Sequence, residues 1–498
     1  MAGEYRGDTG AGGGVPRRTL SEGGGLVPRP EGLEGVRKAL VLGLGESGTA
    51  AAEALSRMGV EVVANDNVPA LEDGKVDSLE RLGCRVVLGS HPLELLEGVD
   101  LLLPSPGIPP SNPLLAEARD RGLRIWSELE LGWRMARGPV VAITGTNGKS
   151  TTVRMTELVI NRSVGRCRAA GNIGYPLVRA AQEAEEGEIL VVEVSSFQLY
   201  FVESFRPRVG VLLNIGEDHL DWHRDMEDYI WAKSRIWARQ TDDDYAVVNL
   251  DDPLCLRAAE GAPGRLRGFS SRDEERAFVY LDGDWIKARL DEGSVRLVER
   301  SRLSVPGGHN LENYMAAAAA GLLMGGAPGD VAEALADFRG LPHRLEWVGR
   351  IQGVDFYDDS KATNPHASLR ALRAFDRPVR LILGGRNKGL DFRELAREIS
   401  DRFRSGLVRE VLVMGEAAGE IGSVLGEVDP GIPVSVCGDL EEVFQRLRRS
   451  VRSGEAVLLS PACASFDQYR SYEHRGEHFQ ELVRTWRKEV QGEEVSPA

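Results

Sequence analysis

The segment from Thr144 to Thr151 carries the strongest chemical signal in the sequence. It reads Thr-Gly-Thr-Asn-Gly-Lys-Ser-Thr and follows an apolar run that ends at Ile143, where a complete P-loop pattern would have glycine. In such a turn the glycines let backbone N–H groups face phosphate oxygens, and the helix N-terminus and lysine add positive charge. The serine hydroxyl can reach a Mg²⁺ ion. The segment predicts a triphosphate-binding loop; the alternative is a glycine-rich turn with a surface lysine.

A second glycine-rich turn, Gly43 to Gly48, matches the pattern G-x-G-x-x-G after an apolar strand. Asp66 follows the next strand, about where the acid of a dinucleotide-binding fold would lie. The pattern is compatible with NAD, with another diphosphate such as that of a nucleotide sugar, or with a tight turn that needs glycine for packing. The residues of this turn leave the three interpretations open.

Two further segments suggest metal or phosphate chemistry. Glu193 ends an apolar strand, and residues 214–221 follow another and are dense in oxygen and nitrogen ligands. A carboxylate at the carboxyl end of a parallel strand is where α/β sheets place ligands and Mg²⁺. Each segment taken alone fits a solvated polar loop as well as it fits a metal or phosphate site. We expect His223 to be a surface residue. Lys233 lies in a helical stretch over 229–238, and its spacing alone predicts a solvated side chain.

The last third of the chain places three polar segments after predicted strands. They cover residues 358–365, 384–389 and 459–468. Each one alone fits a turn, a glycine-rich loop or a helix N-cap. Because parallel strands end at a common edge of the sheet, the three together favour a binding surface.

Short apolar strands and helices alternate along the chain, which predicts βαβ units and parallel sheets. The expected fold class is α/β, with three domains that each hold a mainly parallel sheet flanked by helices. The boundaries are placed near 137 and 341, and a glycine-rich, charged N-terminus without apolar periodicity is expected to be disordered. The predicted segments are a disordered extension at 1–35 and domains at 36–137, 138–340 and 341–498.

The composition narrows the function classes. The chain has 498 residues and a formal net charge of −15, which argues against non-specific nucleic-acid binding. We find no apolar run long enough for a transmembrane helix and no secretory signal, so we expect no membrane insertion. The five cysteines are scattered without metal-ligand spacing, which favours a reducing cytoplasm.

Together these segments resemble the Mur ligase family, from about Lys38 to Leu482. The motifs that carry the resemblance occur in the family's order and are Gly145–Thr151, Gly171–Gly174, Glu193–Gln198, Asn214–Asp221, His309–Asn313, Leu341–Arg344, Asp359–Asn364 and Ser460–Gln468. Asp359–Asn364 is similar to the segment of the member that adds D-glutamate; its sister ligases usually have a Tyr- or His-containing segment there.

The resemblance implies a fold and a reaction. A Rossmann-like first domain would hold the UDP-sugar substrate, a P-loop-type central domain would be the ATPase, and a Rossmann-like third domain would hold ATP and the amino acid. ATP would phosphorylate the carboxylate of UDP-N-acetylmuramoyl-L-alanine, and the amine of D-glutamate would attack the acyl phosphate, releasing ADP and phosphate in peptidoglycan precursor synthesis. The chain is expected to act as a monomer.

The resemblance also implies the nucleotide and metal contacts. The ATP-binding residues would be Gly145, Thr146, Asn147, Gly148, Lys149, Ser150, Thr151, Asn310, Asn313, Arg344 and Asp359. Ser150 and Glu193 would hold one Mg²⁺, and His219 and Lys233 a second. The lysine that matches Lys233 is carbamylated in the family, which turns a cation into an anionic oxygen ligand. The catalytic set would be Lys149, Glu193, His219, Lys233 and Lys361.

Substrate contacts follow from the same match. Ser47, Asp66, Asn67 and Gly107 would bind the uridine diphosphate, although the family's frequent Asp-Thr-Arg segment reads Asp-Asn-Val here. Asn172 and Gln198 would contact the muramoyl part. Lys361, Thr363, Lys388, Ser465, Phe466 and Tyr472 would position D-glutamate and the phosphoryl oxygens, with Tyr472 at a position that is usually Phe.

Three alternatives remain at the level of the sequence. The first is a sister amide ligase of the same superfamily, including folylpolyglutamate synthase. The second is a non-catalytic nucleotide-binding regulator, and the third is a Rossmann oxidoreductase that binds NAD.

Overall fold

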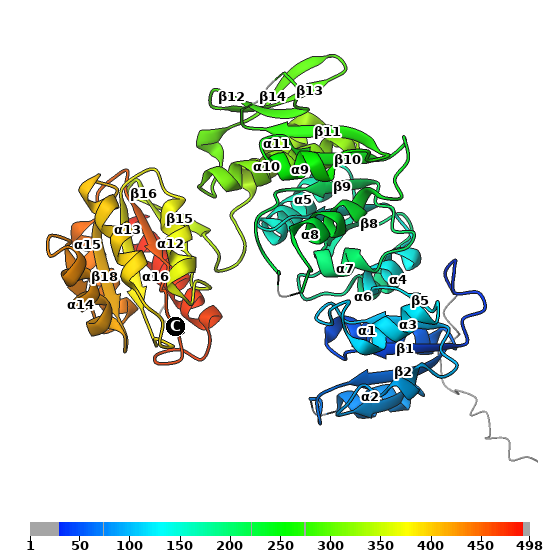
Figure 1. Cartoon of the computed structure of the whole chain (residues 1–498). Coiled ribbons are helices and arrows are strands. Elements are labelled where there is room, and N and C mark those ends of the chain that lie inside the picture. Colours follow the sequence, from blue (N-terminus) through cyan, green and yellow to red (C-terminus); the bar gives the residue numbers. More distant parts are fainter. Residues whose placement is uncertain (1–28, 73, 221, 273–274, 492–498) are drawn as a thin grey trace, which may run out of the picture.

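The computed structural model describes residues 29–491 apart from 73, 221 and 273–274, and three β-sheets follow one another along it, each covered by helices (Figure 1). Most of the expected N-terminal extension, residues 1–28, lies outside the described residues. Within the remainder, Leu33 is fully buried, and Arg29 donates hydrogen bonds to the carbonyls of Met58 and Gly59. Packing therefore begins ahead of Val36.

The first sheet is parallel throughout, in the order β3-β2-β1-β4-β5. Its strands are β1 (Lys38–Leu42), β2 (Glu61–Asp66), β3 (Arg85–Leu88), β4 (Leu101–Pro104) and β5 (Arg124–Ile125). Its helices are α1 (Glu46–Arg57), α2 (Lys75–Arg81), the 3₁₀ turn η1 (Leu93–Leu96) and α3 (Pro113–Asp120). A side chain at Gly48 would place its Cβ 1.9 Å from the carbonyl oxygen of Gly43, so this glycine allows α1 to pack against β1.

The second sheet has nine strands, in the order β14-β13-β12-β11-β10-β9-β6-β8-β7. The strands are β6 (Val140–Thr144), β7 (Cys167–Gly171), β8 (Ile189–Glu193), β9 (Val209–Leu212), β10 (Tyr245–Asn249), β11 (Arg265–Ser270), β12 (Val279–Asp282), β13 (Trp285–Leu290) and β14 (Gly293–Glu299). The helices are α4 (Glu128–Met135), α5 (Lys149–Ser163), α6 (Leu177–Glu183), α7 (Ser196–Tyr200), α8 (Met226–Ser234), η2 (Arg235–Trp237), α9 (Pro253–Ala258), η3 (Arg300–Arg302), α10 (Gly308–Leu323) and α11 (Pro328–Asp337). The last three strands are antiparallel, whereas β7 to β12 pair in parallel.

The third sheet has the order β15-β16-β20-β17-β18-β19 and is parallel except for β15. Its strands are β15 (Glu346–Ile351), β16 (Val354–Asp358), β17 (Val379–Gly384), β18 (Val408–Met414), β19 (Val434–Val436) and β20 (Ala456–Leu459). Its helices are α12 (Pro365–Arg373), α13 (Arg393–Arg404), α14 (Ala418–Val428), α15 (Leu440–Ser450) and α16 (Tyr472–Gln491). The last strand of the chain thus lies in the middle of this sheet.

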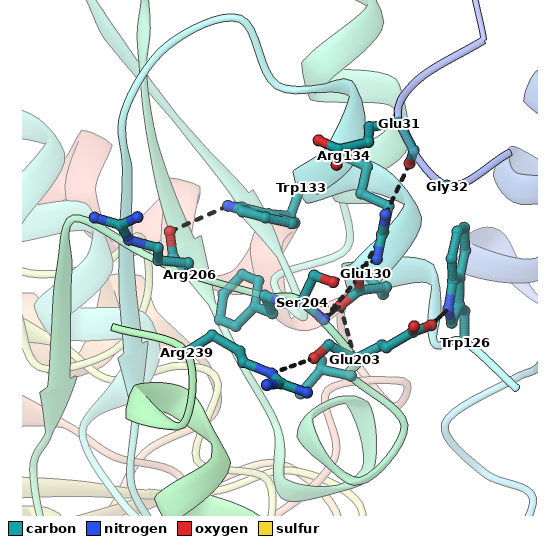
Figure 2. A network of polar contacts seen from close by, with 12 residues as sticks. Glu31, Gly32, Trp126, Glu130, Trp133, Arg134, Glu203, Ser204, Arg206 and Arg239 are labelled. Atoms are coloured by element: carbon teal, nitrogen blue, oxygen red, sulfur yellow. Dashed lines mark hydrogen bonds and ion pairs between the residues drawn. The ribbon is translucent and has the colours of Figure 1, made fainter. Parts of the chain in front are cut away.

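The buried carboxylate of Glu130 ties the first two sheets together at α4 (Figure 2). It accepts hydrogen bonds from the backbone N–H groups of residues 203–205 and from Arg134 Nε. Arg134 also donates to the Ser204 hydroxyl and to the carbonyl of Glu31, and it stacks on the indole of Trp126. This network joins the segment ahead of Val36 and helix α4 to the loop between α7 and β9.

No helix in the described part of the chain combines the length and the apolar character needed to cross a membrane.

Candidate active site

The glycine-rich loop after β6 has the conformation that its sequence predicts. Strand β6 ends at Thr144, and α5 begins at Lys149. Gly148 has a φ of +85°, and a Cβ there would lie 2.4 Å from Asn313 Oδ1. Only glycine accepts both constraints, so the loop can approach α10 closely.

Two lysines converge on this loop. Lys149 Nζ donates to the carbonyls of Gly145 and Thr146, both at 2.9 Å, and Lys233 Nζ donates to the same Gly145 oxygen at 3.0 Å. Lys233 is 1% exposed. Burial, and then the nearby charge of Lys149, hold the pKa of Lys233 well below its usual value. The expectation from spacing that Lys233 is solvated is wrong, because α8 presents it to the loop rather than to water.

Glu193 ends β8 beside the same loop and is 3% exposed. Its Oε1 accepts a hydrogen bond from Asn172 Nδ2 at 3.1 Å. Its Oε2 and the hydroxyl of Thr144 are buried without a hydrogen-bond partner in the described residues. A buried carboxylate oxygen without a donor is costly. A divalent cation would satisfy it, so the residues present fit a Mg²⁺ site.

His219 lies in the loop after β9, with a φ of +54° and a half-exposed side chain. Its Nε2 is 3.4 Å from Asp218 Oδ2, and its ring centroid is 4.7 Å from that of Phe197. The loop is joined to the phosphate loop, because the Asn147 N–H donates to Asn214 Oδ1 at 2.8 Å. Asp221 lies outside the described residues.

His223 is buried, with 2% of its surface exposed, and the expectation of a surface histidine is wrong. Its Nδ1 lies 3.1 Å from Asp228 Oδ2, and its Nε2 lies 2.9 Å from the hydroxyl of Ser196. Aromatic rings of Tyr200, Tyr229 and neighbouring residues pack around it. Its burial depends on chain segments that meet only in the folded protein.

A cleft of about 310 Å³ lies between the second and third sheets. The sequence-predicted residues that line it are Thr146, Asn147, Gly148, Lys149, Ser150, Thr151, Asn310, Asn313, Arg344, Asp359 and Lys361. Gly145, the first glycine of the loop, is buried and is not among the residues that line the cleft. His309 and Arg370 also line the cleft and were not among the predicted site residues. His309 opens the family motif His309–Asn313 but was given no role, and Arg370 belongs to none of the motifs.

Within the cleft, Asn313 Nδ2 donates to Asn310 Oδ1 at 3.2 Å, which orders the two amides on α10. Asp359 is 5% exposed and accepts from the N–H of Leu345 and the hydroxyl of Ser460. Burial raises the pKa of Asp359 to about 7. Its carboxyl therefore changes charge near neutral pH.

The residues expected to bind the amino-acid substrate lie in the third domain, in the segments that follow the carboxyl ends of β16, β17 and β20. Lys361 Nζ lies 5.5 Å from the ring centroid of Tyr472. Ser465 is buried, whereas Lys388 and Phe466 are exposed. Thr363 is half-buried near the start of α12. Apart from Lys361, none of these residues lines the 310 Å³ cleft.

The remaining expected substrate residues lie away from the cleft. Asp66 ends β2, and its Oδ2 accepts from the Leu44 N–H at 2.6 Å. Ser47 lies in the first turn of α1, and Asn67 and Gly107 follow β2 and β4. Gln198 is 1% exposed, and its Oε1 accepts from the N–H and hydroxyl of Ser195, closing a capping box on α7.

Comparison with family models gives three consecutive matches. Residues 37–127 match the "Mur ligase MurD-like, N-terminal domain", residues 143–321 the "Mur ligase middle domain", and residues 343–463 the "Mur ligase, glutamate ligase domain".

Curated relatives match over nearly their whole length. The UDP-N-acetylmuramoylalanine--D-glutamate ligase of Pelotomaculum thermopropionicum is 39% identical over 454 residues, covering 91% of this chain and 98% of the relative. The protein of the same name from Geobacillus kaustophilus is 40% identical, covering 89% of this chain and 96% of the relative.

Solved structures show the same fold at low identity. A UDP-N-acetylmuramoyl-L-alanyl-D-glutamate--2,6-diaminopimelate ligase has a TM-score of 0.55 at 17% identity, covering 91% of this chain and 93% of that one. MurF from Acinetobacter baumannii has a TM-score of 0.52 at 20% identity, covering 71% and 80%.

Proposed function

The chain belongs to the Mur ligase family, and on this basis we propose that it is an ATP-dependent ligase that adds D-glutamate to UDP-N-acetylmuramoyl-L-alanine in peptidoglycan precursor synthesis. The observation that carries the proposal is the identity of 39% over 91% of the chain to a relative that bears this name. The cleft between the second and third sheets supplies the chemical setting, because a phosphate loop and polar groups of both sheets share it.

In this proposal the ATP phosphates lie against Lys149 and the N–H groups of residues 145–151, with Asn310 and Asn313 on α10 beside the loop and Arg344 and Asp359 from the third domain. The terminal phosphoryl group passes to the carboxylate of the L-alanyl substrate, giving ADP and an acyl phosphate. The neutral amine of D-glutamate attacks the acyl carbon. The tetrahedral intermediate loses phosphate and a proton to give the amide.

Two anions must approach each other in the first step. Mg²⁺ bound at Glu193 and Ser150 would neutralise part of that charge. We extend the proposal to a second ion at His219 and a carbamylated Lys233. The buried Oε2 of Glu193 without a donor supports the first site.

The state of Lys233 supports the carbamate. Only a neutral amine adds to CO₂, and the addition releases a proton and leaves an anionic carbamate on Nζ. The buried Lys233, beside Lys149, is biased toward the neutral amine at a pH where an exposed lysine is charged.

The proposal assigns a role to each domain. The first, residues 36–137, would hold the UDP group near Ser47, Asp66, Asn67 and Gly107. The second, 138–340, would hold ATP and, through Asn172 and Gln198, the muramoyl group. The third, 341–498, would hold D-glutamate at Lys361, Thr363, Lys388, Ser465, Phe466 and Tyr472. The proposed unit is a cytoplasmic monomer, and the five free, buried cysteines agree with a reducing compartment.

An amino-acid panel tests the proposal. Phosphate release from ATP is measured with UDP-N-acetylmuramoyl-L-alanine and one of D-glutamate, L-glutamate, L-alanine or diaminopimelate. We expect release with D-glutamate alone. Stimulation by another amino acid and not by D-glutamate would indicate a sister ligase, and ATP binding without turnover would indicate a regulator.

A further inference from the structure

Arg475 reaches under three loops of the third domain. It lies in the first turn of α16 and is 1% exposed. Its Nε donates to the hydroxyl of Ser360 and its Nη2 to the Ser360 carbonyl, both at 2.9 Å. It also donates to the carbonyls of Gly384 at 3.3 Å and Cys463 at 3.1 Å. One guanidinium therefore holds the loops that follow β16, β17 and β20.

The three loops and the guanidinium fit closely around glycine. Gly385 has a φ of +127°, and a Cβ there would lie 3.0 Å from Arg475 Nη1 and 2.2 Å from the carbonyl oxygen of Ala464. The backbones of Arg386 and Ala464 exchange hydrogen bonds at 2.8 and 3.1 Å. The loops thus form one unit around Arg475.

The charge of Arg475 has no ion-pair partner. Its four acceptors are uncharged, and no Asp or Glu in the described part of the chain forms an ion pair with it; Asp467 and Asp358 stabilise its charge from farther away. Arg380 is the contrast: it is also buried, at the opposite end of β17, and it pairs with Glu410 and Glu455. A buried charge whose counter-charges lie beyond ion-pair distance is only partly neutralised, so an added negative group nearby would stabilise it.

We propose that Arg475 is a positioning and specificity residue for the amino acid. It fixes the loops that carry Lys361, Lys388 and Ser465, and its only partly compensated positive charge favours an amino acid with a second carboxylate over a neutral isostere. The inference rests on the proposed function, because it concerns how the same site chooses D-glutamate.

The physical reason for this preference is that the protein interior has low polarisability and therefore screens a charge weakly. Burial lowers the pKa of Arg475 to about 10, so the side chain stays charged at neutral pH. The carbonyl dipoles, together with Asp467 and Asp358 at longer range, compensate that charge only in part. A ligand carboxylate above the loops adds compensation, whereas the amide of D-glutamine adds little.

Two substitutions at Arg475 distinguish its role in positioning the loops from the effect of its positive charge. Arg475→Lys keeps the charge but cannot reach all four acceptors, so the KM for D-glutamate should rise tenfold or more while the KM values for ATP and the UDP substrate stay within twofold. Arg475→Gln should also lower the ratio of kcat/KM for D-glutamate to kcat/KM for D-glutamine tenfold or more. If D-glutamine is not a substrate, its inhibition constant Ki is measured in place of its kcat/KM. Arg380→Lys and Arg380→Gln are the controls: they should lower thermal stability and leave KM and the ratio unchanged.

Cys463→Asp tests the charge with Arg475 in place. Cys463 is buried and close enough for a charge on it to affect the pKa of Arg475. The new carboxylate should neutralise the guanidinium and reduce the preference for D-glutamate over D-glutamine at least fivefold.

Two outcomes would overturn the proposal. An unchanged ratio of kcat/KM for D-glutamate to that for D-glutamine in Cys463→Asp or Arg475→Gln overturns the specificity role, and equal KM changes in the Arg380 variants overturn the positioning role. If the wild-type enzyme itself does not respond to D-glutamate, the proposed function fails instead.

Discussion

Lys149 and Lys233 donate hydrogen bonds to one acceptor, the carbonyl oxygen of Gly145. Like charges on two donors to one oxygen repel each other; unit charges about 4 Å apart repel by about 4 kcal/mol at an effective dielectric constant near 20. Both lysines have lowered pKa values, chiefly through burial, and the shift is larger for Lys233. The neutral amine is therefore favoured more strongly at Lys233 than at Lys149, as the proposed carbamate requires.

Lys233→Ala should lose activity about a thousandfold, because the proposed carbamate supplies the oxygen ligand of a metal. Formate or acetate should restore part of that activity by placing a carboxylate in the cavity left by the side chain. The measurement is phosphate release against carboxylate concentration. Lys233→Arg is the matched control, since its cavity is filled and it should not be rescued. Full activity of Lys233→Ala without added carboxylate would rule out the carbamate.

Lys149→Ala should abolish turnover, by about a thousandfold or more, and leave the fold intact. The Nζ of Lys149 contacts loop carbonyls rather than the apolar core, so the thermal midpoint should move by only about 2 °C. Steady-state phosphate release and thermal unfolding check the two parts. Arg154→Ala, on the exposed face of the same helix, should change neither. Activity within threefold of wild type would contradict a phosphate-binding loop.

Arg370 connects the two walls of the cleft, because its Nη2 donates to Asn147 Oδ1 at 3.3 Å. Arg370→Ala should raise the KM for ATP about tenfold, the equivalent of one charged hydrogen bond at about 1.4 kcal/mol. The KM for D-glutamate should change less than twofold. Arg373→Ala provides the control, since that side chain lies on the same helix and pairs with Glu398 outside the cleft. Equal effects of the two variants would show that the helix, and not the contact, matters.

Glu128 gives a pH dependence of stability. It is fully buried, its Oε1 accepts from the Val178 N–H, and burial raises its pKa from 4.5 to about 7. The folded state therefore binds a proton that the unfolded state has released between pH 4.5 and 7. The resulting stability is present below the unfolded pKa and is lost as the pH rises through 7, by about 3 kcal/mol.

Glu128→Gln removes this titration and keeps an oxygen for the Val178 N–H. Relative to wild type, the variant should gain stability between pH 5 and pH 8, as measured by thermal unfolding at both values. The comparison at two pH values cancels any constant cost of burying the amide. A difference between variant and wild type that does not change with pH would show that Glu128 does not titrate in this range.

The local parts of the site could be predicted from the sequence. The loop at 144–151 follows from a strand, glycines and a helix that are adjacent in the chain, and Glu193 follows from its place at a strand end. The parallel sheets follow from alternating apolar runs. The antiparallel strands β12 to β14 were not predicted, because their short, mixed sequence, with Arg, Lys and Asp between apolar residues, lacks a continuous apolar run.

The parts that depend on distant contacts could not be predicted. His223 is buried by Ser196, Tyr200 and other groups that the chain order keeps apart. Arg370 belongs to the cleft only because α12 faces the phosphate loop across a domain junction. Arg475 looks like any helical arginine in the sequence, and its role depends on three loops from three strands.

The central place of β20 in the third sheet has a consequence for synthesis of the protein. This strand pairs with β16 on one side and β17 on the other, and the two halves of the sheet have no other pairing between them in the described residues. A nascent chain that has emerged as far as β19 therefore exposes two unpaired edges to solvent. Because β20 joins the two halves of the sheet, ribosome stalling before this strand has emerged would yield a product prone to aggregation and to degradation by proteases.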